Sequence, residues 1–394
     1  MSRLPRKNCL RRPDRRGTVR WIAAAALVFH LLAAVISTPA PAAPTPRPPI
    51  IGATSAVLMD ARSGRVLHAK SPDVPRPPAS TTKILTALLA MEALTDETLV
   101  PIHERASEER SGSAIGLEAG ERWKARDLLY ALLMHSANDA AIALAEAVAG
   151  SLDQFAVQMN ARAKTLGARR SHFNSPHGRY HPRHLATAYD LAVIARAALR
   201  IPRFAEIVRT QTWSLARPGQ QSMMLINTNS LLWRYRGADG VKTGWIAQSG
   251  PCLIASATRD GWQLIAVVLN APRMYRDAAA LLDYGFAAFS PVRAAAAGEI
   301  LYDGPLPGGA RFLVAVAEDE VVVPVRRGAS IATRITLLST GAPVRSGQIV
   351  GTAVFSSEGR VVAHVRLLAA EDVRRGSWWA RFVRWARRLA GRPP

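Results

Sequence analysis

The sequence predicts an α/β protein of the α+β kind, in which helices are inserted between the strands of an antiparallel sheet and a small all-β domain follows. Strand pairs lie at both ends of residues 55–290, and helical stretches lie between them. This order brings the first and last strands into one sheet. From residue 294 to residue 370, short β-rich runs alternate with Gly, Pro or Ser, which is typical of a separate all-β domain.

The amino terminus is predicted to be a cleaved export signal over residues 1–43. A basic stretch precedes an uncharged apolar run at residues 21–36, and small residues ending in Pro41-Ala42-Ala43 follow, as in secretory signals. The apolar run is short for a membrane span, so cleavage is favoured over a retained anchor. Residues 44–54 are expected to form a proline-rich linker.

Two β-hairpins are predicted at the ends of the first domain. At residues 55–68, two apolar runs flank the turn Asp60-Ala61-Arg62-Ser63-Gly64, which is a strand-turn-strand pattern. At residues 253–269, the turn Arg259-Asp260-Gly261 contains the Asp-Gly pair that tight hairpins favour.

Three helical stretches are predicted between the hairpins. Residues 84–94 are apolar on nearly every face, which indicates a buried helix. Further stretches are predicted at residues 126–149 and 185–199. Together they predict a helical subdomain inserted into the sheet domain.

The net charge of +22 does not indicate a nucleic-acid-binding protein. Residues 1–20 hold eight basic residues and one acid, and residues 374–394 hold seven arginines and no acid. Most of the positive charge therefore lies in the two ends, and neither end resembles a nucleic-acid-binding module. We accordingly expect no nucleic-acid partner.

Residues 374–394 are predicted to form an amphipathic helix that lies on an anionic membrane surface. At 100° per residue, one face is apolar and the other is basic. The apolar face holds Trp378, Phe382, Trp385 and Leu389, and the basic face holds Arg381, Arg384, Arg387 and Arg388. A helix docked on the protein itself and a nucleic-acid tail are the alternatives, and the three tryptophans favour the bilayer.

Three short motifs indicate a serine nucleophile. They are Ser80-Thr81-Thr82-Lys83, Ser136-Ala137-Asn138 and Lys242-Thr243-Gly244. Each motif alone occurs by accident in chains of this length. All three in this order, in this strand and helix context, are improbable by accident.

The spacing of the first motif has a chemical reason. Residues i and i+3 share a helix face, so Lys83 can reach the hydroxyl of Ser80. A serine hydroxyl becomes a good nucleophile when a neighbouring base takes its proton. Lys83 can be that base if burial or a second cation, for which Lys242 is the candidate, destabilises its ammonium. The backbone N–H groups of Ser80 and Trp245 are the candidate donors to a developing oxyanion.

The other motif residues have expected roles towards the substrate. Ser136 is expected to pass a proton to the leaving amine, and Asn138 to hold a substrate amide. Lys242-Thr243-Gly244 is expected to bind a substrate carboxylate, and Arg276 either assists or is simply solvated. Singly, each motif also has a structural interpretation, such as a helix N-cap for Ser80. The three motifs together favour the catalytic interpretation.

No metal or organic cofactor is expected. His172, His177, His181 and His184 lie within 13 residues of one another. No cysteine and no His-Glu-x-x-His pattern accompanies them. Roles in turns and packing are therefore favoured over zinc binding.

The chain resembles the low-molecular-mass penicillin-binding proteins, the serine-type D-alanyl-D-alanine carboxypeptidases, from about residue 55 to residue 373. Beyond the three motifs, the resemblance rests on six longer segments, one of which is Gly240-Val241-Lys242-Thr243-Gly244. The other five are Pro78-Ala79-Ser80-Thr81-Thr82-Lys83, His135-Ser136-Ala137-Asn138-Asp139-Ala140, His172-Phe173-Asn174-Ser175-Pro176-His177-Gly178, Asn227-Thr228-Asn229-Ser230-Leu231-Leu232 and Leu281-Leu282-Asp283-Tyr284-Gly285-Phe286. Trp245 and the loop at residues 246–250 depart from the family pattern.

The resemblance implies a β-lactamase/D,D-peptidase-like fold followed by the β-rich second domain and an amphipathic anchor. It implies that Ser80 is acylated by peptidoglycan peptides ending in D-Ala-D-Ala, with Lys83, Ser136 and Lys242 in the catalytic roles of the family. The terminal D-alanine is then released, and β-lactams act as inhibitors. It also implies a location on the periplasmic face of the cytoplasmic membrane.

Three alternatives remain open at this stage. A β-lactamase shares the nucleophile, but residue 137 is Ala rather than Asp, and the second domain and the tail argue against it. A D,D-endopeptidase that cuts cross-links is disfavoured mildly by the additional β domain. A non-catalytic wall-binding protein would have no reason to keep all three motifs.

Overall fold

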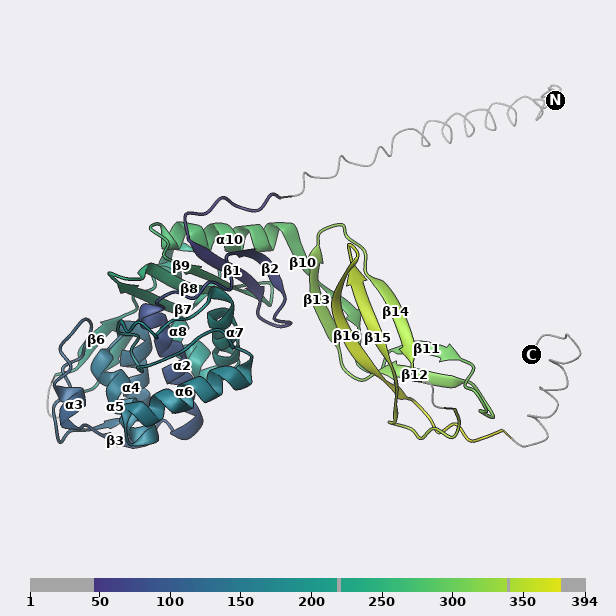
Figure 1. Ribbon diagram of the computed structural model, residues 1–394, viewed down its shortest axis with the longest axis horizontal. Coiled ribbons are helices and arrows are strands. Elements are labelled where there is room, and N and C mark those ends of the chain that lie inside the picture. Colours follow the sequence, from purple (N-terminus) through teal and green to yellow (C-terminus); the bar gives the residue numbers. More distant parts are fainter. Residues whose placement is uncertain (1–45, 218–220, 339–340, 377–394) are drawn as a thin grey trace, which may run out of the picture. The chain divides into compact units, whose positions relative to one another are not determined.

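The computed structural model describes residues 46–217, 221–338 and 341–376 (Figure 1). The predicted signal at residues 1–43 lies outside these residues, as do positions 377–394 of the predicted tail helix. No single helix in the described ranges is both long and apolar enough to cross a membrane.

A five-stranded antiparallel sheet forms the centre of the first domain, with the strand order β2-β1-β9-β8-β7. Its strands are β1 (Ser55–Asp60), β2 (Val66–Lys70), β7 (Ala238–Ile246), β8 (Gly250–Arg259) and β9 (Trp262–Leu269). β1 pairs with β9, with Val57 opposite Val267, so the prediction that the first and last strands meet is confirmed. Both predicted hairpins are confirmed as well.

The two faces of the sheet pack against different helices because successive strand residues point in opposite directions. Val57 and Met59 belong to a core cluster shared with the helical subdomain, whereas Ala56 and Leu58 belong to a cluster shared with helix α10 (Met274–Ala288). Figure 1 shows α10 along the sheet, across from the helical subdomain. The sheet therefore has apolar side chains on both faces.

The helical subdomain lies between β2 and β7 in sequence and contains the predicted buried helix. Its helices are α2 (Lys83–Ala93), α3 (Glu104–Ser107), α4 (Ala125–Tyr130), α5 (Asn138–Ala149), α6 (Leu152–Leu166), α7 (Ala188–Leu199), α8 (Pro202–Arg209) and α9 (Leu231–Arg234). Two small strand pairs accompany them, β3 (Leu99–Pro101) with β4 (Arg122–Lys124) and β5 (Thr212–Leu215) with β6 (Met223–Ile226). Nine of the eleven residues of α2 are buried, from Lys83 to Met91, which confirms that prediction.

The stretch predicted as helical at residues 126–149 is interrupted. α4 continues into a π-helical turn at Ala131–His135, and α5 begins only at Asn138. Between them, Ser136 adopts a left-handed conformation with φ +66°, which no α-helix tolerates in its interior. The interruption places the second motif at a bend instead of along a helix.

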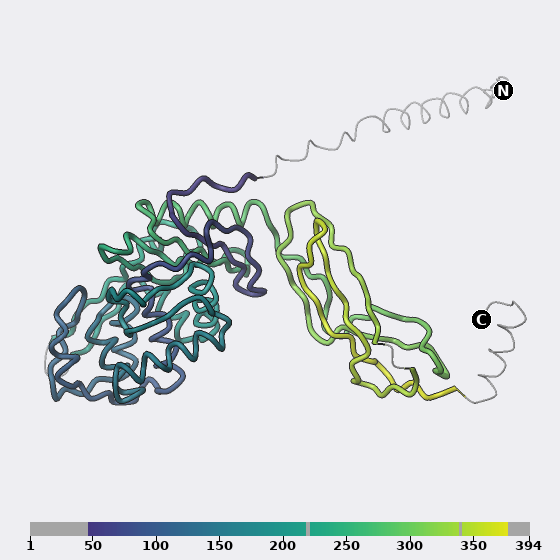
Figure 2. The backbone as a smooth tube through the Cα atoms, in the orientation of Figure 1, coloured from purple at the N-terminus to yellow at the C-terminus, as the bar shows by residue number. Residues whose placement is uncertain are grey.

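The all-β part follows α10 directly along the chain (Figure 2). Its strands are β10 (Phe289–Ala295), β11 (Ile300–Gly304), β12 (Leu313–Ala317), β13 (Val321–Arg326), β14 (Ala332–Leu337), β15 (Ile349–Ser357) and β16 (Arg360–Ala369). Five of them form a sheet in the order β11-β12-β16-β15-β14, and β10 pairs with β13. These strands have their own apolar core, which includes Phe355 and Leu367. Their first strand starts at Phe289, five residues before the boundary that the sequence predicts.

Candidate active site

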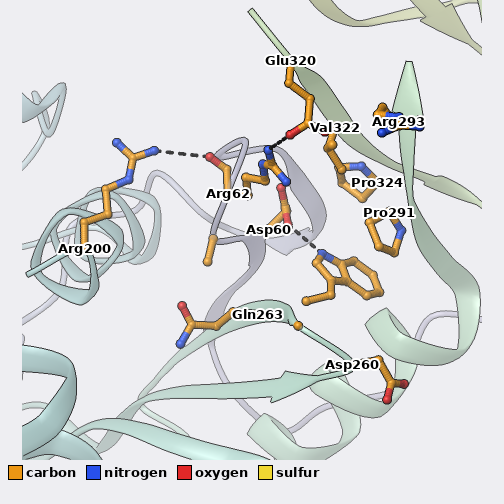
Figure 3. Close-up of a pocket in the computed structure, with 13 residues that line it drawn as sticks. Asp60, Arg62, Arg200, Asp260, Gln263, Pro291, Arg293, Glu320, Val322 and Pro324 are labelled. Carbon is orange, nitrogen blue, oxygen red and sulfur yellow. Dashed lines mark hydrogen bonds and ion pairs between the residues drawn. The ribbon is translucent and has the colours of Figure 1, made fainter. Parts of the chain in front are cut away.

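The three motifs meet at one cleft of about 570 Å³. The motif residues that line it are Ser80, Ser136, Asn138, Thr243 and Gly244, together with Trp245. Lys83 and Lys242 are buried, with 0% and 1% of their surfaces exposed. A second cavity, of about 720 Å³, contains none of the motif residues and is lined by Asp60, Arg62 and Arg200 among others (Figure 3). The smaller cleft is therefore the candidate site.

Ser80 lies in a 3₁₀ turn, Ala79–Thr82, that leads directly into α2. The residue before it, Ala79, has φ +50°, a conformation that costs an alanine about 1–2 kcal/mol. The N–H of Ser80 has no acceptor among the described residues. The turn therefore holds both the hydroxyl and a free amide donor of one residue at the cleft.

Lys83 is the first residue of α2 and is placed to act on Ser80. Its Nζ lies 2.9 Å from Ser80 Oγ, 2.6 Å from Asn138 Oδ1 and 3.1 Å from the carbonyl oxygen of His177. Burial, with the nearby charge of Lys242 as the second cause, lowers the pKa of Lys83 well below its ordinary value. A neutral amine beside a serine hydroxyl is the arrangement that general-base activation needs.

Lys242 lies in β7 with its Nζ 3.1 Å from the backbone oxygen of Thr243. Burial lowers the pKa of Lys242 to about 7. The charge of Lys242 adds to the effect of burial on Lys83, whereas burial alone lowers the pKa of Lys242. Lys83 is the better candidate for the neutral base, and Lys242 for the cation.

The bend at Ser136 brings the second motif to the cleft. The N–H of Asn138 donates to the carbonyl of Ser113 at 2.7 Å, and its side-chain Nδ2 donates to the carbonyl of Ser111 at 2.7 Å. The next residue, Asp139, is fully buried, and its Oδ2 accepts three backbone N–H groups between residues 115 and 117. These bonds fix the loop at residues 109–117, which we call the cleft loop, against the start of α5.

β7 forms another wall of the cleft. Thr243 Oγ1 lies 2.7 Å from Thr228 Oγ1, and the hydroxyl of Tyr275 donates to the Thr228 carbonyl at 2.9 Å. A Cβ atom on Gly244 would lie 3.1 Å from the amide nitrogen of Ser80. Glycine therefore allows the β7 backbone to approach the Ser80 turn closely, which is why the third motif ends in this residue.

The loop at residues 177–179 supports the Ser80 turn from another direction. A Cβ atom on Gly178 would lie 1.9 Å from the carbonyl oxygen of Ala79, so only glycine fits there. Sequence reasoning expected only a turn or packing role for His177 and assigned no role to Gly178 or Thr228. The signal was present, because all three lie inside segments that carry the family resemblance.

Arg276 is not brought to this cleft. It lines a separate cavity with Ile50 and Gly52. The arginine that lines the cleft is Arg179. Trp245 does line the cleft and is 66% exposed.

The clustered histidines have hydrogen-bond partners within the protein. His184 Nδ1 accepts the N–H of Asn174 at 3.1 Å, and its Nε2 lies 3.0 Å from Thr82 Oγ1. His177 Nδ1 accepts the N–H of Arg179 at 3.1 Å. These contacts fit the turn and packing roles expected from the sequence.

The fold and the cleft together define the class of serine acyl-transfer enzymes in which a lysine lies beside the serine hydroxyl. A model of the D-alanyl-D-alanine carboxypeptidase family matches residues 42–273, and a model of the penicillin-binding protein 5 C-terminal domain matches residues 289–375. The chain belongs to the D-alanyl-D-alanine carboxypeptidase family. It is a low-molecular-mass penicillin-binding protein and a serine-type carboxypeptidase of cell-wall metabolism, which confirms the predicted reaction class.

Similar proteins cover nearly the whole chain. The D-alanyl-D-alanine carboxypeptidase DacF of Bacillus subtilis (strain 168) is 31% identical over 86% of this chain and 89% of its own length. DacD of Escherichia coli (strain K12) is 32% identical over 91% of this chain and 96% of its own. The crystal structure of penicillin binding protein 5 from Haemophilus influenzae matches with a TM-score of 0.75 and 29% identity, covering 84% of this chain and 99% of that one.

Proposed function

We propose that Ser80 is the nucleophile and Lys83 the general base of this carboxypeptidase. The observation that supports the proposal most directly is the 2.9 Å contact between Lys83 Nζ and Ser80 Oγ. Lys83 takes the hydroxyl proton while Oγ bonds to the carbonyl carbon between the two D-alanines. The N–H groups of Ser80 and Trp245 donate to the oxyanion that forms.

The tetrahedral intermediate then loses its amine. The C–N bond breaks, the proton reaches the leaving nitrogen from Lys83 through the hydroxyl of Ser136, and free D-alanine departs. The remaining peptide stays esterified to Ser80 Oγ. Water attacks this ester and gives a proton to the neutral Lys83. The bond between the acyl carbon and Ser80 Oγ then breaks, Lys83 returns the proton to Oγ, and the shortened peptide leaves with a new carboxyl group.

The terminal carboxylate of the substrate is assigned to β7. Lys242 supplies a positive charge, and Thr243, bonded to Thr228, supplies a hydroxyl donor. Asn138 holds the amide of the acyl part. A peptide that ends in D-Ala-D-Ala carries a free carboxylate next to the scissile bond, which favours release of the last residue.

The proposal also includes the location of the enzyme. The enzyme lies outside the cytoplasmic membrane, and its carboxyl-terminal helix binds it to the membrane surface. The segment at residues 1–43 has the composition of an export signal, and residues 374–394 have the amphipathic pattern of a surface anchor. Substrate peptides of the wall lie on the same side of that membrane. An enzyme anchored there meets them as they are made.

Covalent labelling tests the catalytic assignment. Labelled penicillin is expected to acylate Ser80, and mass spectrometry of the labelled peptide locates the adduct. The same preparation is expected to release D-alanine from a peptide ending in D-Ala-D-Ala. An adduct on another residue removes Ser80 from the mechanism.

A further inference from the structure

Among the described residues that line the catalytic cleft, Arg179 is the only arginine or lysine. It belongs to none of the three motifs. It follows directly after His177 and Gly178, in the loop whose His177 carbonyl contacts Lys83. Its guanidinium bonds to Glu109 and Ser111 of the cleft loop, away from the β7 residues to which the terminal carboxylate is assigned.

The guanidinium of Arg179 is held in place by hydrogen bonds from only one of its three nitrogen atoms. Its Nη2 donates to Glu109 Oε1 at 3.0 Å, to Glu109 Oε2 at 3.2 Å and to the hydroxyl of Ser111. The Nε and Nη1 donors have no acceptor in the described part of the chain. Because the side chain is 56% exposed, these donors remain open to a ligand.

Glu109 is the fixed partner in this pair. Its side chain is only 8% exposed, and its Oε1 also accepts the N–H of Ser111 at 2.8 Å. The cleft loop thus orients Arg179 from one side through Nη2. A preformed orientation lowers the entropy that an arginine loses on binding an anion.

We propose that Arg179 is a specificity-determining residue that binds a carboxylate on the acyl part of the substrate peptide, in the residue before D-Ala-D-Ala. The inference rests on the function proposed for this cleft. The terminal carboxylate is assigned to Lys242 and Thr243 and leaves with the released D-alanine. A carboxylate that stays with the acyl-enzyme needs a different cation, and Arg179 is the one that the cleft provides.

Two acetylated peptides that differ only in Glu or Gln before D-Ala-D-Ala test this proposal. D-Alanine release gives kcat/KM for each, and the ratio of the two values isolates the effect of the carboxylate. The wild-type enzyme is expected to favour the Glu peptide about fivefold, the size of a partly exposed ion pair. Arg179→Gln is expected to bring the ratio close to one, and Arg179→Lys to keep part of it.

Two further variants separate binding from a structural effect. Arg183→Gln removes an equal charge from an exposed residue of the same loop that does not line the cleft, and it should keep the wild-type ratio. Glu109→Gln retains the shape of the partner and should also keep the preference. If Arg183→Gln abolishes the preference as fully as Arg179→Gln does, the effect comes from the total charge of the loop and the proposal fails.

The proposal also fails if the wild-type enzyme shows no preference, or if Arg179→Gln lowers kcat/KM for both peptides equally. Failure of the underlying function has a different signature. In that case neither peptide releases D-alanine in any variant, and labelled penicillin leaves Ser80 unmodified.

Discussion

The Nζ of Lys83 lies within hydrogen-bonding distance of both Ser80 Oγ, at 2.9 Å, and Asn138 Oδ1, at 2.6 Å. One buried amine thus joins the first motif to the second. Because a neutral amine is both an acceptor and a donor, it can accept the proton of Ser80 while it donates to Asn138. A permanently charged group at this position would lose the first of these functions.

Lys83→Ala and Lys83→Arg are therefore expected to slow penicillin acylation of Ser80 by about a hundredfold to ten-thousandfold, the usual contribution of a general base. Arginine fails because its guanidinium does not give up its proton in this pH range. The acylation rate is measured by stopped-flow or by gel labelling. Lys124→Ala, which removes only an exposed ion pair with Glu97, is the control and should acylate normally. Near-normal labelling of a folded Lys83 variant would assign the base to another group.

The pH dependence of kcat/KM for a D-Ala-D-Ala peptide is expected to be bell-shaped. The pKa of Lys83 is lowered, so the neutral base is lost on the acid side, as pH falls through that value. The pKa of Lys242 is lowered to about 7, so the cation that binds the terminal carboxylate is lost as pH rises above about 7. Lys242→Arg should move the alkaline limb to higher pH because arginine stays protonated. An alkaline limb at an unchanged pH in this variant would exclude Lys242 as its source.

Gly178→Ala is expected to disturb the Ser80 turn. The new Cβ would meet the carbonyl oxygen of Ala79 at 1.9 Å, so either the loop or the turn must shift. Gly328→Ala is the matched control, since its φ of +82° is similar and nothing lies within 4 Å of its added Cβ. Urea unfolding should show a loss about 1–3 kcal/mol larger for Gly178→Ala than for the control, together with slower acylation. Equal losses would mean that the backbone conformation alone requires glycine.

The folded protein is expected to lose stability below pH 6.5 because of buried histidines. Burial lowers the pKa of His184 to about 4, whereas an unfolded histidine has a pKa of about 6.5. Between these pH values the histidine is protonated in the unfolded chain but not in the folded chain. The free energy of unfolding therefore falls as pH falls, by up to about 3 kcal/mol. His184→Asn should reduce the difference between urea unfolding at pH 7 and at pH 4.5. His103→Asn, at an exposed histidine, is the comparison variant, and the same behaviour in both variants would rule out His184 as the cause.

A chain that stops after residue 376 is expected to leave the membrane fraction and appear in the soluble periplasmic fraction. This cut retains the bond from Arg375 Nε to the carbonyl of Ala342 at 2.8 Å and removes only the amphipathic segment. Exchanging its apolar residues for Ser should have the same effect, because aromatic burial persists when salt screens the arginines. D-Alanine release from a small soluble peptide should be kept. Sedimentation with membranes after confirmed signal cleavage would contradict the anchoring role.

The fold and most of the cleft could be predicted because their signals are local. The i, i+3 spacing of Ser80 and Lys83 depends only on helix geometry, and the Asp-Gly turn at residues 260–261 depends only on backbone preference. The left-handed Ser136 was not predicted, since a serine carries no sequence signal for positive φ. The contact of Gly178 with Ala79 was not predicted either, because it joins two loops a hundred residues apart.

The position of Arg276 is a second feature that the sequence did not predict. Its charge made it a candidate for the substrate carboxylate, but charge does not tell where a helix places a side chain. Arg179 was not a candidate in the sequence. It lines the cleft, where its side chain bonds to Glu109. Side-chain orientation, which depends on partners distant in the sequence, is the part that composition and spacing do not determine.

The interruption of the helix at Ser136 has a practical consequence. In the proposed mechanism the reacting groups come from segments near residues 80, 136 and 242, and they meet only when the bend, the Ser80 turn and β7 are all formed. A chain that has lost any of these contacts has no activated serine, although its sequence is intact. Penicillin labelling is therefore expected to count correctly folded molecules. The ratio of labelled to total protein is expected to measure how completely a preparation, or a variant exported from cells, has reached its native state.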